Sequence, residues 1–247
     1  MLNRTEGEPK AKAWLRRAAV WLLWIALWQA IAAMVRNPII FVGPFEMLRA
    51  LWDQLFDAVF WQTIGHSFGK ISLGFLGAFA TGLVLGSLAY RFPFLGELLE
   101  PFMSLIRSIP VASFVILALI WIGSGSLSVC ISYLVVLPIV YVNTIAGLAS
   151  TDLRLLEMAR VFHMPALKKV RFIYVPALMP YLVSGCKTAL GMSWKSGIAA
   201  EVIGIPDTSI GEQLYYSKLY LDTAGLFAWT FVIVVVSAVF GQLFLFL

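Results

Sequence analysis

Charged residues are scarce in this sequence: only 13% of its 247 residues are Asp, Glu, Lys or Arg, whereas 61% are hydrophobic. The mean hydropathy is +0.89. Because a soluble domain carries far more charge on its surface, this composition predicts a polytopic membrane protein. The length leaves room for about six transmembrane helices with short loops, and for no separate soluble domain.

Histidine and cysteine are rarer still, with two residues of each. Cys130 and Cys186 lie far apart within apolar runs and lack the close spacing of metal ligands, so we interpret them as free packing residues. His66 and His163 have no cluster of nucleophiles or ligands beside them, which argues against an intramembrane enzyme. The Gly69-Lys70 pair lacks the other residues of a phosphate loop. We therefore expect no ATP, cofactor or metal site in this chain.

The net charge of +5 comes from basic residues that cluster beside the apolar runs. Five Lys or Arg lie within residues 1–17 and five within 151–171. This juxtamembrane placement fits membrane topology and anionic lipid better than nucleic acid, which we exclude as a partner. Because basic residues concentrate on the cytoplasmic side, we predict a cytoplasmic tail at 1–17, a single transmembrane domain at 18–247 and a cytoplasmic 151–171 segment.

Six apolar stretches predict the spans, at about 18–35, 64–90, 101–122, 127–148, 172–204 and 223–247. Residues 46–60 have one broad apolar face and should lie on the membrane surface, whereas 205–222 should form a polar loop. Pro110 should break or bend the third span, and several Pro and Gly residues should bend or interrupt the fifth. The sequence ends in an apolar run without a polar tail, so we expect the natural chain to continue.

The stretch 151–171 is the most highly charged after the N-terminus. Asp152 can cap a helix start, and Leu155, Ala159 and Phe162 recur at helical spacing. Pro165 should end that helix after about three turns. This pattern favours a short amphipathic helix at the membrane surface, although the charge alone is equally typical of a solvated basic loop.

One motif in this stretch carries a family resemblance. Glu157-Met158-Ala159, three residues, His163, nine residues and Ile173-Tyr174-Val175-Pro176 resemble the EAA signature of ATP-binding-cassette (ABC) importer permeases. That signature reads Glu-Ala-Ala, three residues, Gly, nine residues and Ile-x-Leu-Pro. The spacing here is identical, but Met158, His163 and Val175 depart from it. The departure at His163 matters most if the family glycine has a positive φ, which histidine tolerates better than a branched residue.

Further runs resemble permeases of the nitrate, sulfonate and taurine importer group, among them Leu105–Ala112 and Gly185–Gly204. The resemblance implies the type I ABC importer permease fold, all-α and polytopic, in the cell inner membrane. It implies as partners a second permease copy, a cytosolic ATPase dimer that binds ATP and Mg, and a periplasmic or lipid-anchored solute-binding protein. A coupling helix at 151–165 would dock on the ATPase, and its candidate residues are Leu155, Glu157, Ala159, Arg160, Phe162, His163 and Pro165.

Ionisable residues interrupt the fifth segment. Lys187 and Lys195 are eight residues apart and share a face of a regular helix, and Glu201 follows. Such groups at membrane depth should face the bundle interior or a water-filled cavity. They are either an anion path or structural lysines that snorkel or pair with Glu201. Since the family has a basic residue at the position of Lys187 whatever the solute, Lys195 is the better candidate for solute contact.

The expected pathway also includes Arg107, Pro110 and Trp194, which lie in the runs that resemble the family. Separately, a stripe of small residues four apart in the second span should let another helix approach closely, and two permease copies are one candidate for that contact. The stripe consists of Gly74, Ala78, Gly82 and Gly86. The solute remains open: a sulfonate-, taurine- or nitrate-like anion, or another small nutrient such as a thiamine precursor. A secondary transporter is the rival class, but no convincing internal repeat supports it.

Overall fold

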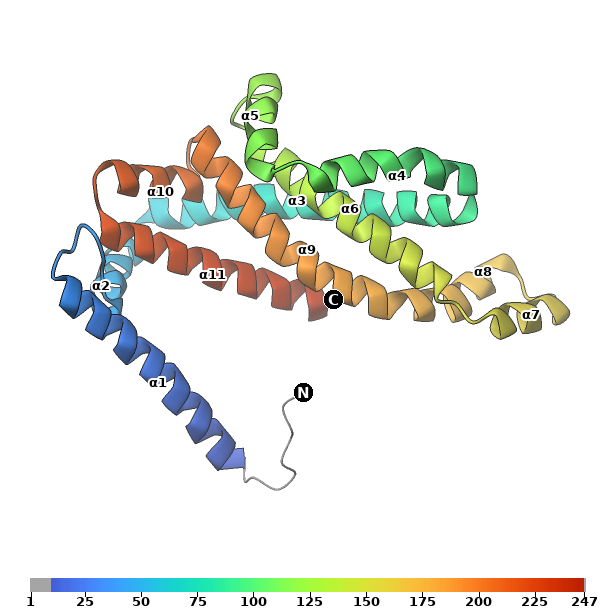
Figure 1. Ribbon diagram of the computed structural model, residues 1–247, viewed down its shortest axis with the longest axis horizontal. Coiled ribbons are helices and arrows are strands. Elements are labelled where there is room, and N and C mark those ends of the chain that lie inside the picture. Colours follow the sequence, from blue (N-terminus) through green and yellow to red (C-terminus); the bar gives the residue numbers. More distant parts are fainter. Residues whose placement is uncertain (1–9, 247) are drawn as a thin grey trace.

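A computed structural model describes residues 10–246, and all of its regular elements over that range are helical (Figure 1). In chain order they are α1 (Lys10–Val35), α2 (Pro44–Leu55), α3 (Ala58–Arg91), α4 (Pro93–Ser108), α5 (Val111–Ile122), α6 (Leu127–Ala149), α7 (Leu153–Val161), α8 (Ala166–Lys169), the π-helical turn η1 (Val170–Tyr174), α9 (Val175–Gly204), α10 (Ile210–Leu219) and α11 (Thr223–Phe246). The predicted all-α polytopic fold is confirmed.

Four helices are long and apolar enough to cross a membrane: α1, α3, α6 and α11. The pair α4 and α5 meets the same criteria jointly but is bent by 104°. At 30 residues, α9 is also long enough to span, although it contains two lysines and a glutamate. In Figure 1 the α7 end of the bundle, at the right, carries α7, α8 and the C-terminal end of α3, whereas α2 and α10 lie at the opposite end.

The centre of the bundle is formed by α3, α6 and α9, which pack side by side. The small-residue stripe of α3 faces α6 of the same chain. A Cβ atom on Gly74 would lie 2.5 Å from the Val129 carbonyl oxygen, and one on Gly86 would lie 2.7 Å from Thr144 Cβ. The stripe therefore packs closely against another helix, and that helix is α6 of the same chain rather than one of a second copy. By contrast, α1 leaves the bundle in Figure 1 and its apolar stretch is not buried.

The fifth segment is helical throughout and is not interrupted, because η1 passes directly into α9. Pro176 lies in the first turn of α9, directly after η1, and Pro180 lies within the helix. Two glycines instead mark close packing on α6: a Cβ on Gly185 would lie 2.7 Å from Asn143 Cγ, and one on Gly197 would lie 2.6 Å from Ser132 Oγ. The segment is therefore not interrupted at these glycines, which provide room for a neighbouring helix.

Other boundaries also differ from the prediction. The surface helix ends at Leu55 rather than at 60, because Asp57 caps a new helix and accepts a hydrogen bond of 3.0 Å from the Val59 amide. The 205–222 segment contains α10 instead of a continuous loop, and Ser209 caps it by accepting from the Glu212 amide. Of the expected 1–17 tail, residues 1–9 lie outside the described range and the rest begins α1.

Candidate functional site

The predicted amphipathic helix is present as α7, shorter than expected. Asp152 caps it by accepting a hydrogen bond of 2.9 Å from the Arg154 amide, which satisfies one of the free donors at the helix start. The helix ends at Val161, four residues before Pro165, and Pro165 instead precedes α8. Together α7, α8 and the turn between them form a projection at one end of the bundle (Figure 1), which we call the α7–α8 hairpin.

A turn centred on His163 ends α7. The Met164 amide donates to the Ala159 carbonyl over 2.9 Å and the His163 amide donates to the Arg160 carbonyl over 3.1 Å, which is the hydrogen-bond pattern of a Schellman motif. In that motif the residue after the cap adopts a left-handed conformation, and His163 has a φ of +48°. Glycine is favoured in this conformation, which gives a physical reason for the glycine of the EAA signature at the position that His163 occupies here.

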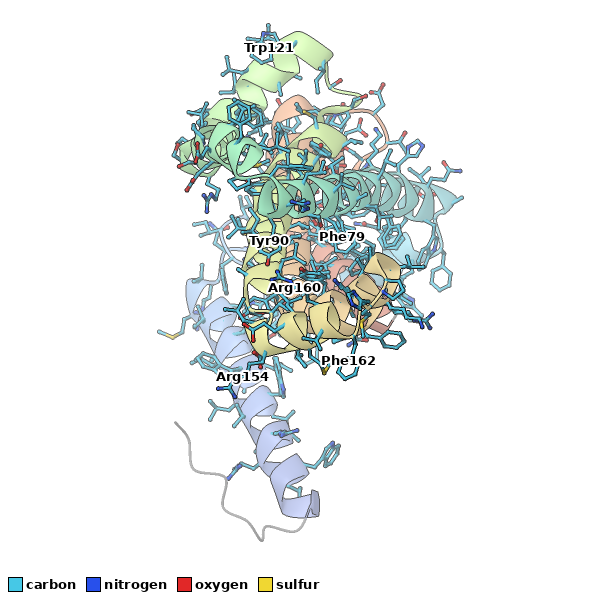
Figure 2. The ribbon with its side chains drawn as sticks, turned by 90° about the vertical axis from the view of Figure 1, so that its right-hand side faces the viewer. Phe79, Tyr90, Trp121, Arg154, Arg160 and Phe162 are labelled. Atoms are coloured by element: carbon cyan, nitrogen blue, oxygen red, sulfur yellow. The ribbon has the colours of Figure 1, made fainter. Side chains whose placement is uncertain are left out.

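The α7–α8 hairpin exposes several large apolar side chains. Phe162 is 77% exposed, Val161 73% and Leu153 72%, whereas Ala159 is fully buried. Glu157, Arg154 and Arg160 are also exposed, and Figure 2 shows the labelled Arg154, Arg160 and Phe162 at this end of the molecule. An apolar patch surrounded by charges on a short projecting element is typical of a protein-binding surface.

The hairpin is joined to the membrane bundle by a continuous helical path. The π-turn η1 follows α8 directly and passes into α9, and the Val175 amide donates to the Val170 carbonyl. Pro176 explains the wider turn, because its ring clashes with the carbonyl four residues earlier. The elements α8, η1 and α9 therefore follow one another without a loop.

Pro110 produces the predicted break in the third span. It precedes α5, and Ile109 before it is extended, as the residue before a proline prefers. Arg107 lies one turn before the break and is exposed, and its Nε donates to the Met103 carbonyl over 3.4 Å. Arg107, Glu100 and Tyr141 line a cavity of about 390 Å³ between α4 and α6.

The lysines of α9 share one exposed face. Lys187 and Lys195 are both exposed, and a Cβ on Gly191 between them would meet no atom within 4 Å. Trp194 lies on another face: it is 2% exposed and its ring centroid is 6.0 Å from that of Phe68. The structure thus keeps the two lysines together and places Trp194 in the core.

Glu201 is fully buried on the side of α3 and α10, away from the lysine face. Its Oε2 accepts from Ser67 Oγ over 2.8 Å and from the Gly211 amide over 3.3 Å. Ser67 Oγ in turn accepts from the Ile210 amide. Among the contacts of the described residues, Glu201 has neither Lys187 nor Lys195 as a partner. Its carboxylate instead binds the start of α10. Sequence reasoning missed Ser67, because nothing in the spacing relates it to residues 134 positions later.

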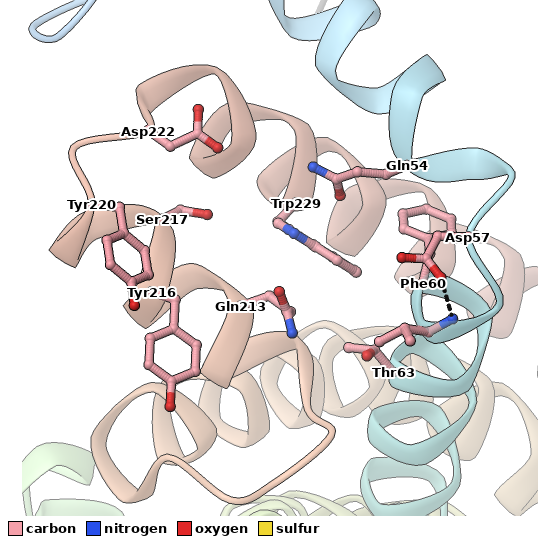
Figure 3. A pocket seen from close by; sticks show the side chains of 11 residues that line it. Gln54, Asp57, Phe60, Thr63, Gln213, Tyr216, Ser217, Tyr220, Asp222 and Trp229 are labelled. Atoms are coloured by element: carbon pink, nitrogen blue, oxygen red, sulfur yellow. Dashed lines mark hydrogen bonds between the residues drawn. The ribbon is translucent and has the colours of Figure 1, made fainter.

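At the end opposite to α7, a cavity of about 540 Å³ lies between α2, α3, α10 and α11 (Figure 3). Its wall combines aromatic, amide and carboxylate side chains, including Trp229, Gln54 and Asp57. Sequence reasoning also missed this cavity, since it depends on α10, which it interpreted as a loop.

Comparison with known proteins places these features in a family. Residues 78–247 match the model of the family described as "binding-protein-dependent transport system inner membrane component". The matched region contains the bent pair, the α7–α8 hairpin and the lysine face.

Three curated proteins are similar over most of their length. A putative aliphatic sulfonates transport permease protein of Bacillus subtilis is 26% identical, with 95% of this chain and 84% of the relative covered. A nitrate import permease protein of Synechococcus elongatus is 24% identical, with 79% and 74% covered. A taurine transport system permease protein of Escherichia coli is 25% identical, with 72% and 68% covered.

Proposed function

This chain belongs to the binding-protein-dependent transport system inner membrane component family, and we propose that it is the permease subunit through which an ABC importer moves a small anionic solute. The permease class follows from the family and from relatives named as permeases. The family consists of transport components rather than enzymes, so neither an intramembrane enzyme nor a secondary transporter has support.

The lysine face of α9 supports an anionic solute. Two ammonium groups within a membrane-spanning helix are costly unless they face water or an anion, and Glu201 does not neutralise them. The three relatives are named for sulfonates, nitrate and taurine, which all carry an anionic group. Arg107, beside the α4–α5 break, adds a third cation that is exposed in the single chain. We assign Lys187, Lys195 and Arg107 to the pathway and Pro110 to the bend beside it.

The α7–α8 hairpin supports coupling to an ATPase, and its exposed apolar surface is the observation that carries this proposal. On the cytoplasmic side, Leu155, Glu157, Arg160 and Phe162 would contact a subunit that binds ATP and Mg. Ala159, His163 and Pro165 would shape the hairpin: the first is buried and the other two form its turn and the start of α8. Closure of an ATPase dimer would move the hairpin and, through η1, α9.

We place the remaining partners from the same geometry. Two copies of this chain would line the pathway with their lysine faces, which are unpaired in the single chain. A periplasmic or lipid-anchored solute-binding protein would dock at the end that carries the 540 Å³ cavity. The inner membrane is the location of the family, and a cytoplasmic N-terminus follows if the basic 151–171 segment is cytoplasmic.

Phe162→Asp tests ATPase docking. Because Phe162 is 77% exposed, the substitution should leave the chain folded and inserted while its carboxylate disrupts an apolar contact. We expect the variant to lose co-purification of its partner ATPase subunit. Phe45→Asp is the control, since Phe45 is 71% exposed at the opposite end of the bundle. Undiminished ATPase binding by Phe162→Asp would refute docking at this surface.

Lys195→Ala tests the solute class separately. Uptake of a sulfonate, taurine or nitrate into proteoliposomes should fall about tenfold or more, because the loss of one charge contact costs on the order of 1.5–3 kcal/mol. The exposed Lys218→Ala in α10 is the control, which should transport normally. Unchanged uptake by Lys195→Ala would show that this lysine is structural.

A further inference from the structure

A second cavity lies beside the connection between the hairpin and the bundle, and neither the coupling role nor the solute pathway uses it. It has a volume of about 490 Å³ and lies between the last two turns of α3 and the path formed by α8, η1 and α9. Two cations, Arg91 and Lys169, stand at its wall together with Tyr90 and Tyr174. The rest of the lining is largely aliphatic and includes Leu83, Leu148, Val170 and Leu178.

Polarity changes with depth along both walls of this cleft. On α3, Arg91 is the last residue and Leu83 lies eight residues earlier, about 12 Å deeper into the bundle. On the opposite wall, Lys169 ends α8 and Leu178 lies nine residues further along, at a similar depth. Each wall thus presents a cation at the surface and leucine at the level of the hydrocarbon. This gradient matches a phospholipid, with its phosphate outside and its acyl chains inside.

The cations of the cleft are available for a ligand. Arg91 and Lys169 form no ion pair with a carboxylate among residues 10–246; the Arg91 guanidinium lies 5.4 Å from the Phe92 ring centroid. The rings of Tyr90 and Tyr174 meet edge to face at 6.4 Å, and amphipathic rings of this kind concentrate at the membrane interface. In the proposed topology, on which this inference rests, the basic hairpin puts this end of the bundle at the cytoplasmic leaflet, where anionic lipids concentrate.

We propose that this cleft binds an anionic phospholipid of the cytoplasmic leaflet, with Arg91 and Lys169 holding the phosphate and the leucines contacting an acyl chain. The occupant is a lipid rather than a soluble phosphate, because the apolar inner part of the cleft would contact an acyl chain but would make no favourable contact with a free phosphate. The lipid would lie against η1, the segment that joins the hairpin to α9. Its presence would therefore stiffen the element through which hairpin movement reaches the membrane.

The test measures phosphatidylglycerol and phosphatidylcholine retained by the full-length chain in native mass spectrometry after exchange in mixed lipid–detergent micelles. Wild-type protein should retain phosphatidylglycerol preferentially. The double variant Arg91→Gln/Lys169→Gln should reduce that preference by about 30-fold, because each cation near the surface contributes about 1 kcal/mol. Equal retention of the two lipids by the wild type would overturn the proposal without any variant.

The matched control is Lys168→Gln/Arg171→Gln, which removes the same amount of charge at residues that flank Lys169 in the chain but do not line the cleft. It should keep the preference; an equal loss in both double variants would mean general charge attraction and no site. Val170→Trp fills the cleft at a half-exposed position and keeps both cations. It should also abolish retention, and full retention by Val170→Trp would refute the acyl-chain contact.

Discussion

Gly74→Ala should destabilise the chain, because the stripe of α3 has no room for a side chain. The added Cβ would lie 2.5 Å from the Val129 carbonyl oxygen, whereas ordinary contact begins at 3.4 Å. The obstacle is backbone, so no rotamer change relieves it and α6 must retreat by about 0.9 Å. Overpacking of this kind costs about 1–3 kcal/mol.

Gly69→Ala is the matched control on the same helix. A Cβ there meets nothing within 4 Å, and alanine is favoured over glycine within a helix by about 1 kcal/mol. Because both variants gain this helix propensity, they should differ by the overpacking cost of about 1–3 kcal/mol, which corresponds to roughly 2–12 °C in the thermal midpoint of the detergent-purified protein.

Protein concentration separates packing within a chain from packing between chains. Because the stripe contacts α6 of its own chain, the lower midpoint of Gly74→Ala should not depend on concentration. Equal midpoints for Gly74→Ala and Gly69→Ala would show that the α3–α6 packing is wrong. If the lower thermal midpoint of Gly74→Ala disappears at high protein concentration, the stripe packs at an interface between two copies of the chain.

Two further substitutions test the local geometry. Because His163 has a φ of +48°, His163→Val should destabilise the turn after α7 by more than about 1 kcal/mol, whereas His163→Gly should stabilise it slightly. Hydrogen exchange of the Met164 amide should become faster in the valine variant and slower in the glycine variant. Equal exchange in the two variants would contradict the left-handed conformation. Glu201→Leu should leave the buried Ser67 hydroxyl and Gly211 amide without their acceptor, at a cost of about 1–3 kcal/mol each. Limited proteolysis between α9 and α10 should therefore be faster in Glu201→Leu than in Glu201→Gln, which keeps an acceptor. Equal cleavage of the two variants would refute the anchoring of α10 by Glu201.

The sequence was sufficient for features that depend on local chemistry. Composition and apolar run length predicted the all-α membrane fold, Asp152 predicted the cap of α7, and Pro110 predicted the break between α4 and α5. The motif spacing identified position 163 as the one where a positive φ would matter for the choice of residue. In each case the responsible residue acts on its own turn of backbone, so no tertiary information was needed.

Features that depend on tertiary contacts were missed. The glycines of α9 were interpreted as bends, because a lone chain does not show that Asn143 and Ser132 occupy the space beside them. The burial of Trp194, the partnership of Ser67 with Glu201 and the three cavities all require the packing of distant helices. Two missed signals were local: the Asp57 cap, which marks the start of α3, and the capping pair Ser209 and Glu212, which marks the start of α10.

The central claim is that the α7–α8 hairpin couples ATP hydrolysis to transport. The direct measurement is the ratio of solute imported to ATP hydrolysed in proteoliposomes containing the complete importer with Glu157→Arg. Glu157 is exposed on α7, so the substitution should leave the chain inserted and the ATPase active while the ratio falls at least tenfold. A ratio equal to that of the wild type, with the ATPase still bound, would contradict the account.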